Sequence, residues 1–384
     1  MPSTHPPPAR LAIHPDGSIA LDRPPAADRL LLPAMINAHA HLELHRIGPR
    51  PYDPDAGFAG WVEMLREHWP GDGDPMKRVR DTGWMVDAAR AAARASLEQG
   101  VTHVGDIAHA VEVVRAWQAQ GLGGVGYLEM FGLGPPFDAP ARGVLEAAQG
   151  AVRAGIDVGL QPHAPYSAGP TVFDAASRAA LRPSTHLAET PDELAFVAEA
   201  TGPFRDLLER IGKWRPEFAG SYTRGLTPIG WMRPYLERRP WLLAHANYLT
   251  DEDIDTLAGL PEHARASVVY CPIASEYFGH RGHRYRDLIE ADINVCLGTD
   301  SVVCQPPDET QPYAVMPQMR RLYRRDGTDP ATLVRMATVN GARALGLSGL
   351  DFTTPRSWIA IDAEDPTCPL EQVLRSDRSV RLFV

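Results

Sequence analysis

The sequence has few cysteines and lysines, and it lacks long apolar or basic runs. Its 4 cysteines form no C-x-x-C pair, which argues against a disulfide scaffold or a thiolate zinc site and fits a reducing cytoplasm. No run of about 18 apolar residues is present, so we expect no membrane span, and the N-terminus does not resemble a signal peptide. The net charge of −10 argues against nucleic-acid binding. We therefore expect a cytoplasmic protein that acts on a small molecule, and the sequence permits a homodimer.

The order of strand-like and helix-like segments predicts the fold. No glycine-rich phosphate fingerprint follows a strand-like segment, which weakens a nucleotide-cofactor interpretation. Residues 9–35 read as short strands with a Pro-Asp-Gly hairpin turn, and residues 357–384 have the same character. We predict a small β domain from residues 1–33 and 350–384. Strands alternate with helices over residues 34–349, which favours a (β/α)8 barrel over an open sheet, although alternation alone does not separate the two.

Local signals mark several helix ends. Residues 81–99 form an amphipathic, alanine-rich segment, and Gly100 stands where a C-cap glycine belongs. Thr190 and Glu193 predict a capping box with proline at the first helical position. Residues 201–240 interrupt the alternation with aromatic residues and prolines. We interpret them as an inserted region near the mouth of an active site or, equally, as a surface excursion with its own aromatic cluster.

Side chains that bind metals stand where apolar strand-like segments end. The strand ends of a barrel form its catalytic face. His39 and His41 follow LLPAMINA, and residues i and i+2 of a strand point to the same side, so both rings can reach one metal ion. Core histidines would have to recur at several strand ends to explain the pattern otherwise. The predicted site therefore comprises His39, His41, His186, Glu189, His245 and Asp300.

Five segments carry a resemblance to a known family. INAHAHLEL, THLAET, LAHAN, CPIAS and LGTDS resemble, in order and separation, the signature segments of the amidohydrolase superfamily. ATVNGARALGL resembles the helix that closes its barrel, so the resemblance runs from about residue 30 to the C-terminus. It implies a distorted (β/α)8 TIM barrel beside a small β-sandwich domain formed by both termini. One departure is Ala274-Ser275-Glu276, which stands where relatives often carry a Ser-Asn pair.

The resemblance also implies a site for one metal ion. Members with two metals usually carry a carboxylated lysine at the fourth strand, but the matching segment, VGLQPHAPYS, has none. The two lysines, Lys77 and Lys213, lie at no predicted strand end. THLAET fits the H-x-A-E pattern of the one-metal branch. The implied ligands of one divalent ion, zinc or alternatively iron, are His39, His41, His186 and Asp300.

The same resemblance assigns catalytic roles to Glu189, His245 and Asp300. The metal would lower the pKa of a bound water. Glu189 would carry a proton from that water to a ring nitrogen of the substrate, because its carboxyl can both accept and donate. His245 would aim the hydroxide, and Asp300 would accept the second proton. The tetrahedral carbon then expels ammonia.

Further residues point to an adenine nucleoside as the substrate. His163 resembles the fourth-strand histidine that contacts substrate in this group, with a buried structural histidine as the alternative. HLEL with Glu43, together with Phe58, Trp61 and Trp69, resembles deaminases of 6-aminodeoxyfutalosine, a nucleoside of menaquinone biosynthesis. Glu129 ends GVGYLEM and could hold a ribose hydroxyl or cap a helix.

The carboxyphenyl group of that nucleoside requires a cationic partner. The candidates for this partner are Arg46, Arg281 and Arg284, although each could instead be an ordinary surface arginine. Of the three, we include Arg281 among the predicted substrate-binding residues.

The sequence thus predicts a hydrolytic deaminase of an adenine-type nucleoside, with 6-aminodeoxyfutalosine as the specific expectation. Within the same superfamily, the alternatives are another purine or S-adenosylhomocysteine-type deaminase and a triazine-like chlorohydrolase. A barrel that only binds would have lost a ligand or the proton shuttle, and neither is lost here.

Overall fold

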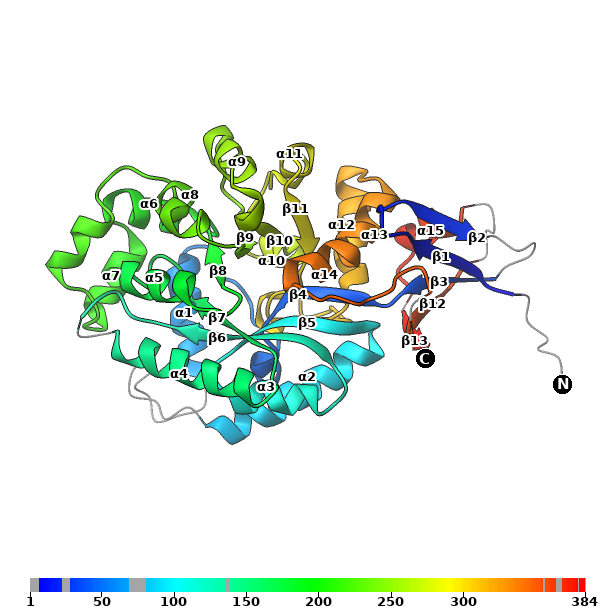
Figure 1. Cartoon of the computed structure of the whole chain (residues 1–384), viewed down its shortest axis with the longest axis horizontal. Coiled ribbons are helices and arrows are strands. Elements are labelled where there is room, and N and C mark those ends of the chain that lie inside the picture. Colours follow the sequence, from blue (N-terminus) through cyan, green and yellow to red (C-terminus); the bar gives the residue numbers. More distant parts are fainter. Residues whose placement is uncertain are drawn as a thin grey trace.

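The computed structural model describes residues 7–22, 28–68, 81–135, 138–354, 356–363, 368–378 and 380–383. Within these ranges the chain forms two four-stranded parallel sheets and one five-stranded sheet, with helices packed around them (Figure 1).

The two parallel sheets hold the strands that carry the predicted site. The first contains β4 (Met35–Ala40), β5 (Val101–Ala108), β6 (Gly123–Met130) and β7 (Val158–Pro162), and the second contains β8 (Ser184–Leu187), β9 (Leu242–His245), β10 (Ser267–Tyr270) and β11 (Asn294–Leu297). Most of their residues are buried, as expected for parallel strands that are covered on both faces.

Two isolated parallel bridges connect the sheets. Ala40, at the end of β4, bridges to Asp300 beyond β11, and Leu160 of β7 bridges to Pro183 just before β8. Both outer strands of one sheet therefore meet an outer strand of the other. The carboxyl ends of the eight strands consequently share one edge, where the predicted ligands stand.

The helices of the described residues mostly follow the strands in chain order. Their bounds, with 3-10 helices written η, are η1 (Leu42–Ile47), α1 (Gly57–His68), α2 (Thr82–Glu98), α3 (Val111–Gln118), α4 (Ala139–Arg153), α5 (Pro170–Arg178), α6 (Pro191–Glu199), α7 (Pro203–Arg210), η2 (Pro216–Ser221), α8 (Pro228–Leu236), α9 (Asp251–Ala258), η3 (Glu262–Ala264), α10 (Pro272–Tyr277), α11 (Tyr285–Glu290), η4 (Val302–Cys304), α12 (Val315–Asp326), α13 (Pro330–Ala337), α14 (Val339–Leu345) and α15 (Pro369–Arg375).

The predicted starts of α2 and α6 are both capped by a side chain, but the capping box predicted for α6 does not form. Asp81 caps α2 by accepting from the Trp84 N–H, and Gly100 beyond its end has φ of +83°, which suits glycine. Thr190 caps α6 and accepts from the Glu193 N–H. The Glu193 side chain does not close the predicted capping box, however, because it turns to the Ala188 and Glu189 N–H groups instead.

The five-stranded sheet joins the two ends of the chain. Its order is β13 (Arg381–Phe383), β12 (Trp358–Asp362), β3 (Arg29–Pro33), β1 (Ala9–Ile13) and β2 (Ile19–Asp22). β1 and β2 form the predicted hairpin, and β12 pairs antiparallel with β3. In Figure 1 the N-terminal strands, in blue, lie beside the C-terminal segments, in red, at one end of the molecule. The described residues form one sheet here, so the two-layered sandwich and the domain bounds stay predictions.

The segment of residues 201–240 contains α7, η2 and α8, and it carries an aromatic cluster. The rings of Tyr222 and Trp231 stack at 5.6 Å between centroids. The segment also contacts the loop after β7: Phe204 stacks on Tyr166 at 3.7 Å, and the Tyr222 hydroxyl donates to the Pro165 carbonyl. Both sequence interpretations therefore hold in part, since the segment packs on itself and on a loop at the carboxyl edge.

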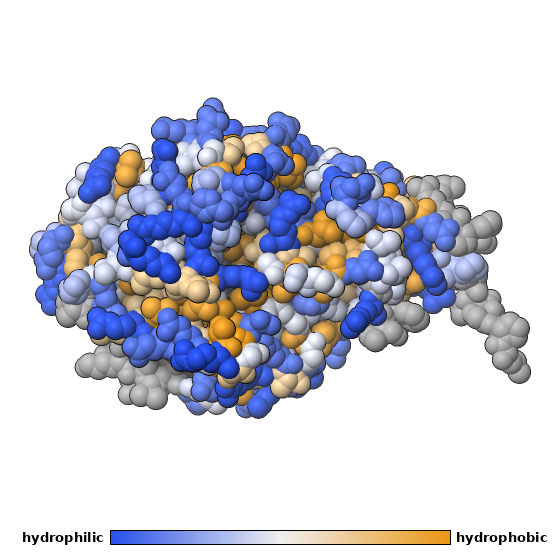
Figure 2. Space-filling model, viewed as in Figure 1, coloured by the Kyte–Doolittle hydropathy of each residue, from blue (hydrophilic) through white to orange (hydrophobic). Residues whose placement is uncertain are grey.

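Hydrophilic side chains cover most of the face in Figure 2, with hydrophobic groups scattered between them. Among the described residues, the exposed large hydrophobic side chains are Val152 and Leu226. None of the described helices combines the length and the apolar character that a bilayer crossing requires.

Candidate active site

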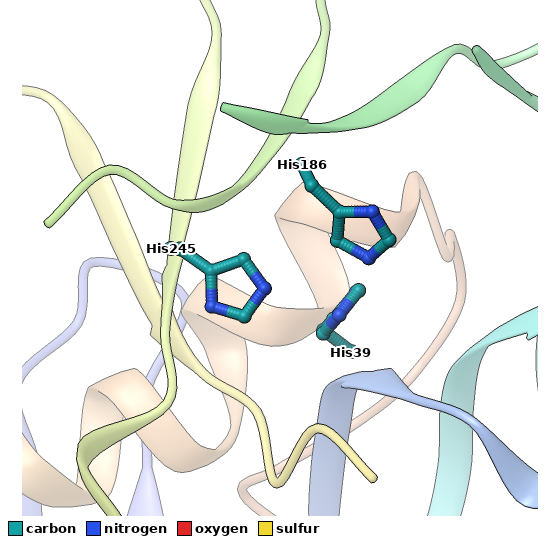
Figure 3. Close-up of side chains that lie close together, drawn as sticks. All are labelled: His39, His186 and His245. Atoms are coloured by element: carbon teal, nitrogen blue, oxygen red, sulfur yellow. The ribbon is translucent and has the colours of Figure 1, made fainter. Parts of the chain in front are cut away.

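Three histidines from three strands point toward one another at the carboxyl edge (Figure 3). His39 comes from β4, His186 from β8 and His245 from the end of β9. Their ring centroids lie 5.1 to 5.4 Å apart, and all three rings are buried. Strands that are distant in sequence thus deliver three imidazoles to one point.

His41 and Asp300 complete this cluster. Asp300 Oδ1 lies 3.4 Å from His41 Nε2 and 3.6 Å from His39 Nε2. Neither ring nitrogen of His39 has a hydrogen-bond partner among the described residues, although the side chain is fully buried. A buried imidazole normally has a partner. Imidazole nitrogens converging with a carboxylate oxygen form a donor set that suits a divalent ion such as zinc.

Neighbouring groups orient the cluster. His186 Nδ1 lies 3.0 Å from the His163 carbonyl oxygen, which leaves its other nitrogen for the cluster. The Cys304 thiol donates to Asp300 Oδ2 at 3.2 Å. Lys213 lies between α7 and η2 in the chain, and Lys77 lies outside the described residues. The described part of β7 therefore offers no lysine to bridge a second metal.

Glu189 stands beside His245, and a second glutamate holds its backbone. Glu189 Oε1 lies 3.5 Å from His245 Nε2. The buried Glu193 carboxylate accepts from the Ala188 and Glu189 N–H groups, each at 2.8 Å. The Asn247 amide donates to the Glu189 carbonyl at 3.0 Å. The Glu189 side chain is thus positioned through the peptide units on either side of its Cα.

Burial and neighbouring charges set the protonation of these groups. Burial raises the pKa of Glu189 well above its usual range, and the charges of Asp300 and Glu193 add to the shift. Burial lowers the pKa of His41 to about 4 and that of His245 to about 3. Burial alone would raise the pKa of Asp300, but the rings of His39, His245 and His41 dominate and hold it far below its usual range. Neutral histidines and an ionised aspartate are the forms that bind metals.

The backbone at this edge is strained. Six described residues other than glycine have positive φ, and four of them follow the strands that carry the cluster: Ala188 (49°), His245 (74°), Ala246 (51°) and Asp300 (59°). Such conformations cost on the order of 1–3 kcal/mol each and persist where surrounding contacts enforce them. At this edge the hydrogen bonds of Glu193 and Asn247 supply part of that enforcement.

Comparison with known proteins agrees with this geometry. The model of the amidohydrolase family matches residues 30–350. The chain belongs to the amidohydrolase family. Over 336 residues this amidohydrolase is 26% identical to the 5-methylthioadenosine/S-adenosylhomocysteine deaminase of Halalkalibacterium halodurans, with 83% of this chain and 68% of the relative covered. Over 363 residues it is 29% identical to the aminodeoxyfutalosine deaminase of Deinococcus radiodurans, with 87% and 78% covered.

Solved structures share the amidohydrolase fold. The aminofutalosine deaminase of Helicobacter pylori superposes with a TM-score of 0.72 at 19% identity, with 93% of this chain and 86% of that chain covered. The atrazine chlorohydrolase of Arthrobacter aurescens TC1, solved with zinc, gives 0.68 at 17% identity, with 97% and 91% covered. At these identities the likeness concerns the fold.

A second buried cluster lies beside the first in this amidohydrolase. Glu43, at 1% exposure, pairs with the ring of His109, whose other nitrogen lies 2.7 Å from Glu129. Glu129 in turn lies 3.9 Å from His163, whose ring is 4.9 Å from that of His186. Three predicted substrate residues therefore lie together, joined by a histidine that we did not single out. His109 ends VTHVGDIAH, so the strand-end criterion applied to the other histidines would have found it.

The predicted arginine candidates have different surroundings. Arg46 lies 3.9 Å from Asp87, and Arg284 pairs with Asp251 and Asp287 at 2.6 Å each. Arg281 is exposed in the loop between α10 and α11. Its role as a substrate anchor stays a prediction.

The predicted aromatic residues lie at α1 where they are described. Phe58 packs between Trp61 and Phe278, with centroids 5.5 and 4.9 Å away, whereas Trp69 lies outside the described residues. Phe58 and Trp61 thus pack together at α1, and their role beside the far end of the substrate stays a prediction.

Proposed function

We propose that this amidohydrolase is a metal-dependent deaminase of adenine-type nucleosides, with 6-aminodeoxyfutalosine as the leading substrate. The observation that carries the proposal is the position of Glu189, 3.5 Å from His245 and at the edge of the buried set of histidines and Asp300. A carboxyl that can both take and give a proton is the group that hydrolytic deamination needs.

The fold completes the proposal. We infer that the two parallel sheets, bridged at both seams, form a distorted (β/α)8 barrel, and that the terminal sheet belongs to a small β-sandwich domain. A barrel would gather the eight strand ends around one pocket. A cytoplasmic location, a homodimer and a role in menaquinone biosynthesis stay predictions.

We infer that one divalent metal, zinc or alternatively iron, is held by His39, His41, His186 and Asp300. When bound, it would supply a Lewis acid that lowers the pKa of water to near neutrality. The buried, neutral histidines and the ionised Asp300 support this assignment.

The reaction would add the oxygen of water to the ring carbon that carries the amino group and expel ammonia, so protons must move. Glu189 would take a proton from water at Oε1 and pass it to the neighbouring ring nitrogen. The raised pKa of Glu189 supports this role, since its proton is held long enough to be delivered. His245, with its lowered pKa, would orient the attacking oxygen as a neutral ring, and Asp300 would accept the second proton.

Two sequence relatives support an adenine nucleoside as the substrate class. Both are named as deaminases of compounds in which an adenine carries a substituted sugar. The 29% identity to the aminodeoxyfutalosine enzyme and the aromatic residues of α1 favour a substrate with an aromatic substituent. A 5-methylthioadenosine or S-adenosylhomocysteine deaminase is the second candidate, and a triazine-type chlorohydrolase is the third because its fold also matches.

Ammonia release from a panel of nucleosides tests the proposal. The purified enzyme, loaded with zinc or with iron, is assayed on 6-aminodeoxyfutalosine, 5-methylthioadenosine, S-adenosylhomocysteine, adenosine and a chlorinated triazine. We expect the highest kcat/KM with 6-aminodeoxyfutalosine. Turnover of the triazine alone would favour the third candidate, and no turnover of any 6-aminopurine would refute the deaminase.

A further inference from the structure

His109 lies between two buried glutamates at the end of β5. Its Nδ1 contacts Glu43 Oε1, and its backbone N–H donates to Glu43 Oε2 at 3.0 Å. Its Nε2 lies 2.7 Å from Glu129 Oε2. Side chains from η1, from the residue after β5 and from β6 thus contact one another next to the predicted metal cluster.

Both ring nitrogens of His109 face carboxylate oxygens. An ionised carboxylate only accepts hydrogen bonds. With both glutamates ionised, both nitrogens donate and the ring is an imidazolium between two carboxylates. A metal ion could bind only one nitrogen of this ring and could not replace both contacts. The arrangement is accordingly an ion-paired network and not a second metal site.

The network fixes the direction of the Glu129 carboxylate. Oε2 is held by His109, so Oε1 is turned toward His163 Nε2, 3.9 Å away. His163 Nδ1 lies 2.6 Å from Ser167 Oγ, so a hydrogen bond to this hydroxyl orients the His163 ring.

We propose that His109 is a positioning residue that fixes Glu129 as the acceptor for the vicinal hydroxyls of the substrate's sugar. The inference rests on the proposed function. The base would react at Glu189, just beyond β8, and at His245 at the end of β9, so the sugar attached to it would extend toward neighbouring strands. Sugar hydroxyls donate hydrogen bonds, and Glu129 Oε1 is an acceptor held in place on β6. Glu43 then does not contact the sugar but orients Glu129 indirectly, through His109.

The test compares ribonucleosides with deoxynucleosides, by turnover and by binding. Adenosine, 2′-deoxyadenosine and 3′-deoxyadenosine are assayed for kcat/KM, and inosine with its two deoxy analogues is titrated by calorimetry. The variants are His109→Gln, Glu129→Gln and Glu43→Gln. Glu43→Gln weakens the contact at His109 Nδ1, on the side of the ring opposite Glu129. His103→Gln is the matched control, because His103 lies partly buried near the opposite end of the same strand. Bound metal and thermal stability are measured for every variant.

We expect the wild type and His103→Gln to prefer the ribo form about 10- to 100-fold, as one charge-assisted hydrogen bond allows. His109→Gln and Glu129→Gln should lose most of this preference while keeping one metal per chain, and Glu43→Gln should lose part of it. If His109→Gln fails to fold, Glu43→Gln and Glu129→Gln decide the question.

Equal binding of ribo and deoxy forms by the wild type would overturn the inference, as would an unchanged preference in the folded variants or a second metal lost with His109. Turnover without discrimination refutes the inference alone. Discriminating binding without turnover refutes the deaminase alone, and neither binding nor turnover refutes both.

Discussion

Glu193→Ala should destabilise the chain strongly and impair catalysis although Glu193 does not touch the predicted metal cluster. The substitution removes the acceptor of two buried N–H groups, those of Ala188 and Glu189. An unsatisfied buried donor costs about 1–3 kcal/mol, so the pair costs about 4 kcal/mol. The one buried methylene group that is lost adds about 0.8 kcal/mol. The sum, about 5 kcal/mol, is comparable to the whole stability of many domains, about 5–15 kcal/mol.

Denaturant unfolding and steady-state kinetics measure the two effects. We expect kcat to fall about 10- to 100-fold with a smaller change in KM, because the peptide that positions Glu189 is released. Glu193→Gln keeps one acceptor and should cost about half as much stability. Asp253→Ala is the control: this buried aspartate closes the capping box of α9, and its loss should cost about 1 kcal/mol and leave kcat unchanged. Wild-type stability and kcat in Glu193→Ala would refute the reasoning.

Three further results are expected. Glu189→Gln should keep its metal, by elemental analysis, and lower kcat about 10²- to 10⁴-fold; near-normal turnover would show that another group moves the proton. Removing the metal with a chelator should abolish activity and lower the Tm, because His39 is left buried without a partner. Adding zinc back should restore the activity and the Tm. An unchanged Tm after metal removal would count against the site. Burial raises the pKa of Asp106 from 3.8 to about 8. The folded chain therefore keeps a proton on Asp106 that the unfolded chain releases. The contribution of Asp106 to the free energy of unfolding accordingly declines as pH rises from about 4 to 8. Asp106→Asn, studied without metal, should therefore gain stability relative to the wild type between pH 5 and pH 8, and a constant difference would exclude the shift.

Much of the site could be predicted because the ends of strands can be recognised in the sequence. An apolar run followed by a histidine or aspartate marks both the end of a strand and a candidate ligand. The fold brings His39, His41, His186, His245 and Asp300 together. The Pro-Asp-Gly hairpin and the start of α2 were also predictable, because they depend on neighbouring residues alone.

The remaining features depend on contacts between distant residues. Spacing indicated that Glu193 could close a capping box, but the choice between its own helix and the Ala188 and Glu189 N–H groups is made by the tertiary fold. The carboxylate partners of Arg46 and Arg284 lie far from them in the sequence, so spacing could not reveal these pairs. The link between Glu43 and Glu129 passes through His109 and spans three separate elements, so no local pattern contains it.

The terminal sheet has a consequence for how this chain folds. β3 pairs with β12, so Leu32 finds its partner Ile359 only after nearly the whole chain has been made. β4, which carries His39 and leads directly to His41, begins at Met35, two residues after β3 ends. Contacts this distant in sequence form slowly, since a very long loop must close first. The strand that delivers two predicted ligands is therefore anchored late, and we expect metal binding during refolding to follow the pairing of the chain's two ends.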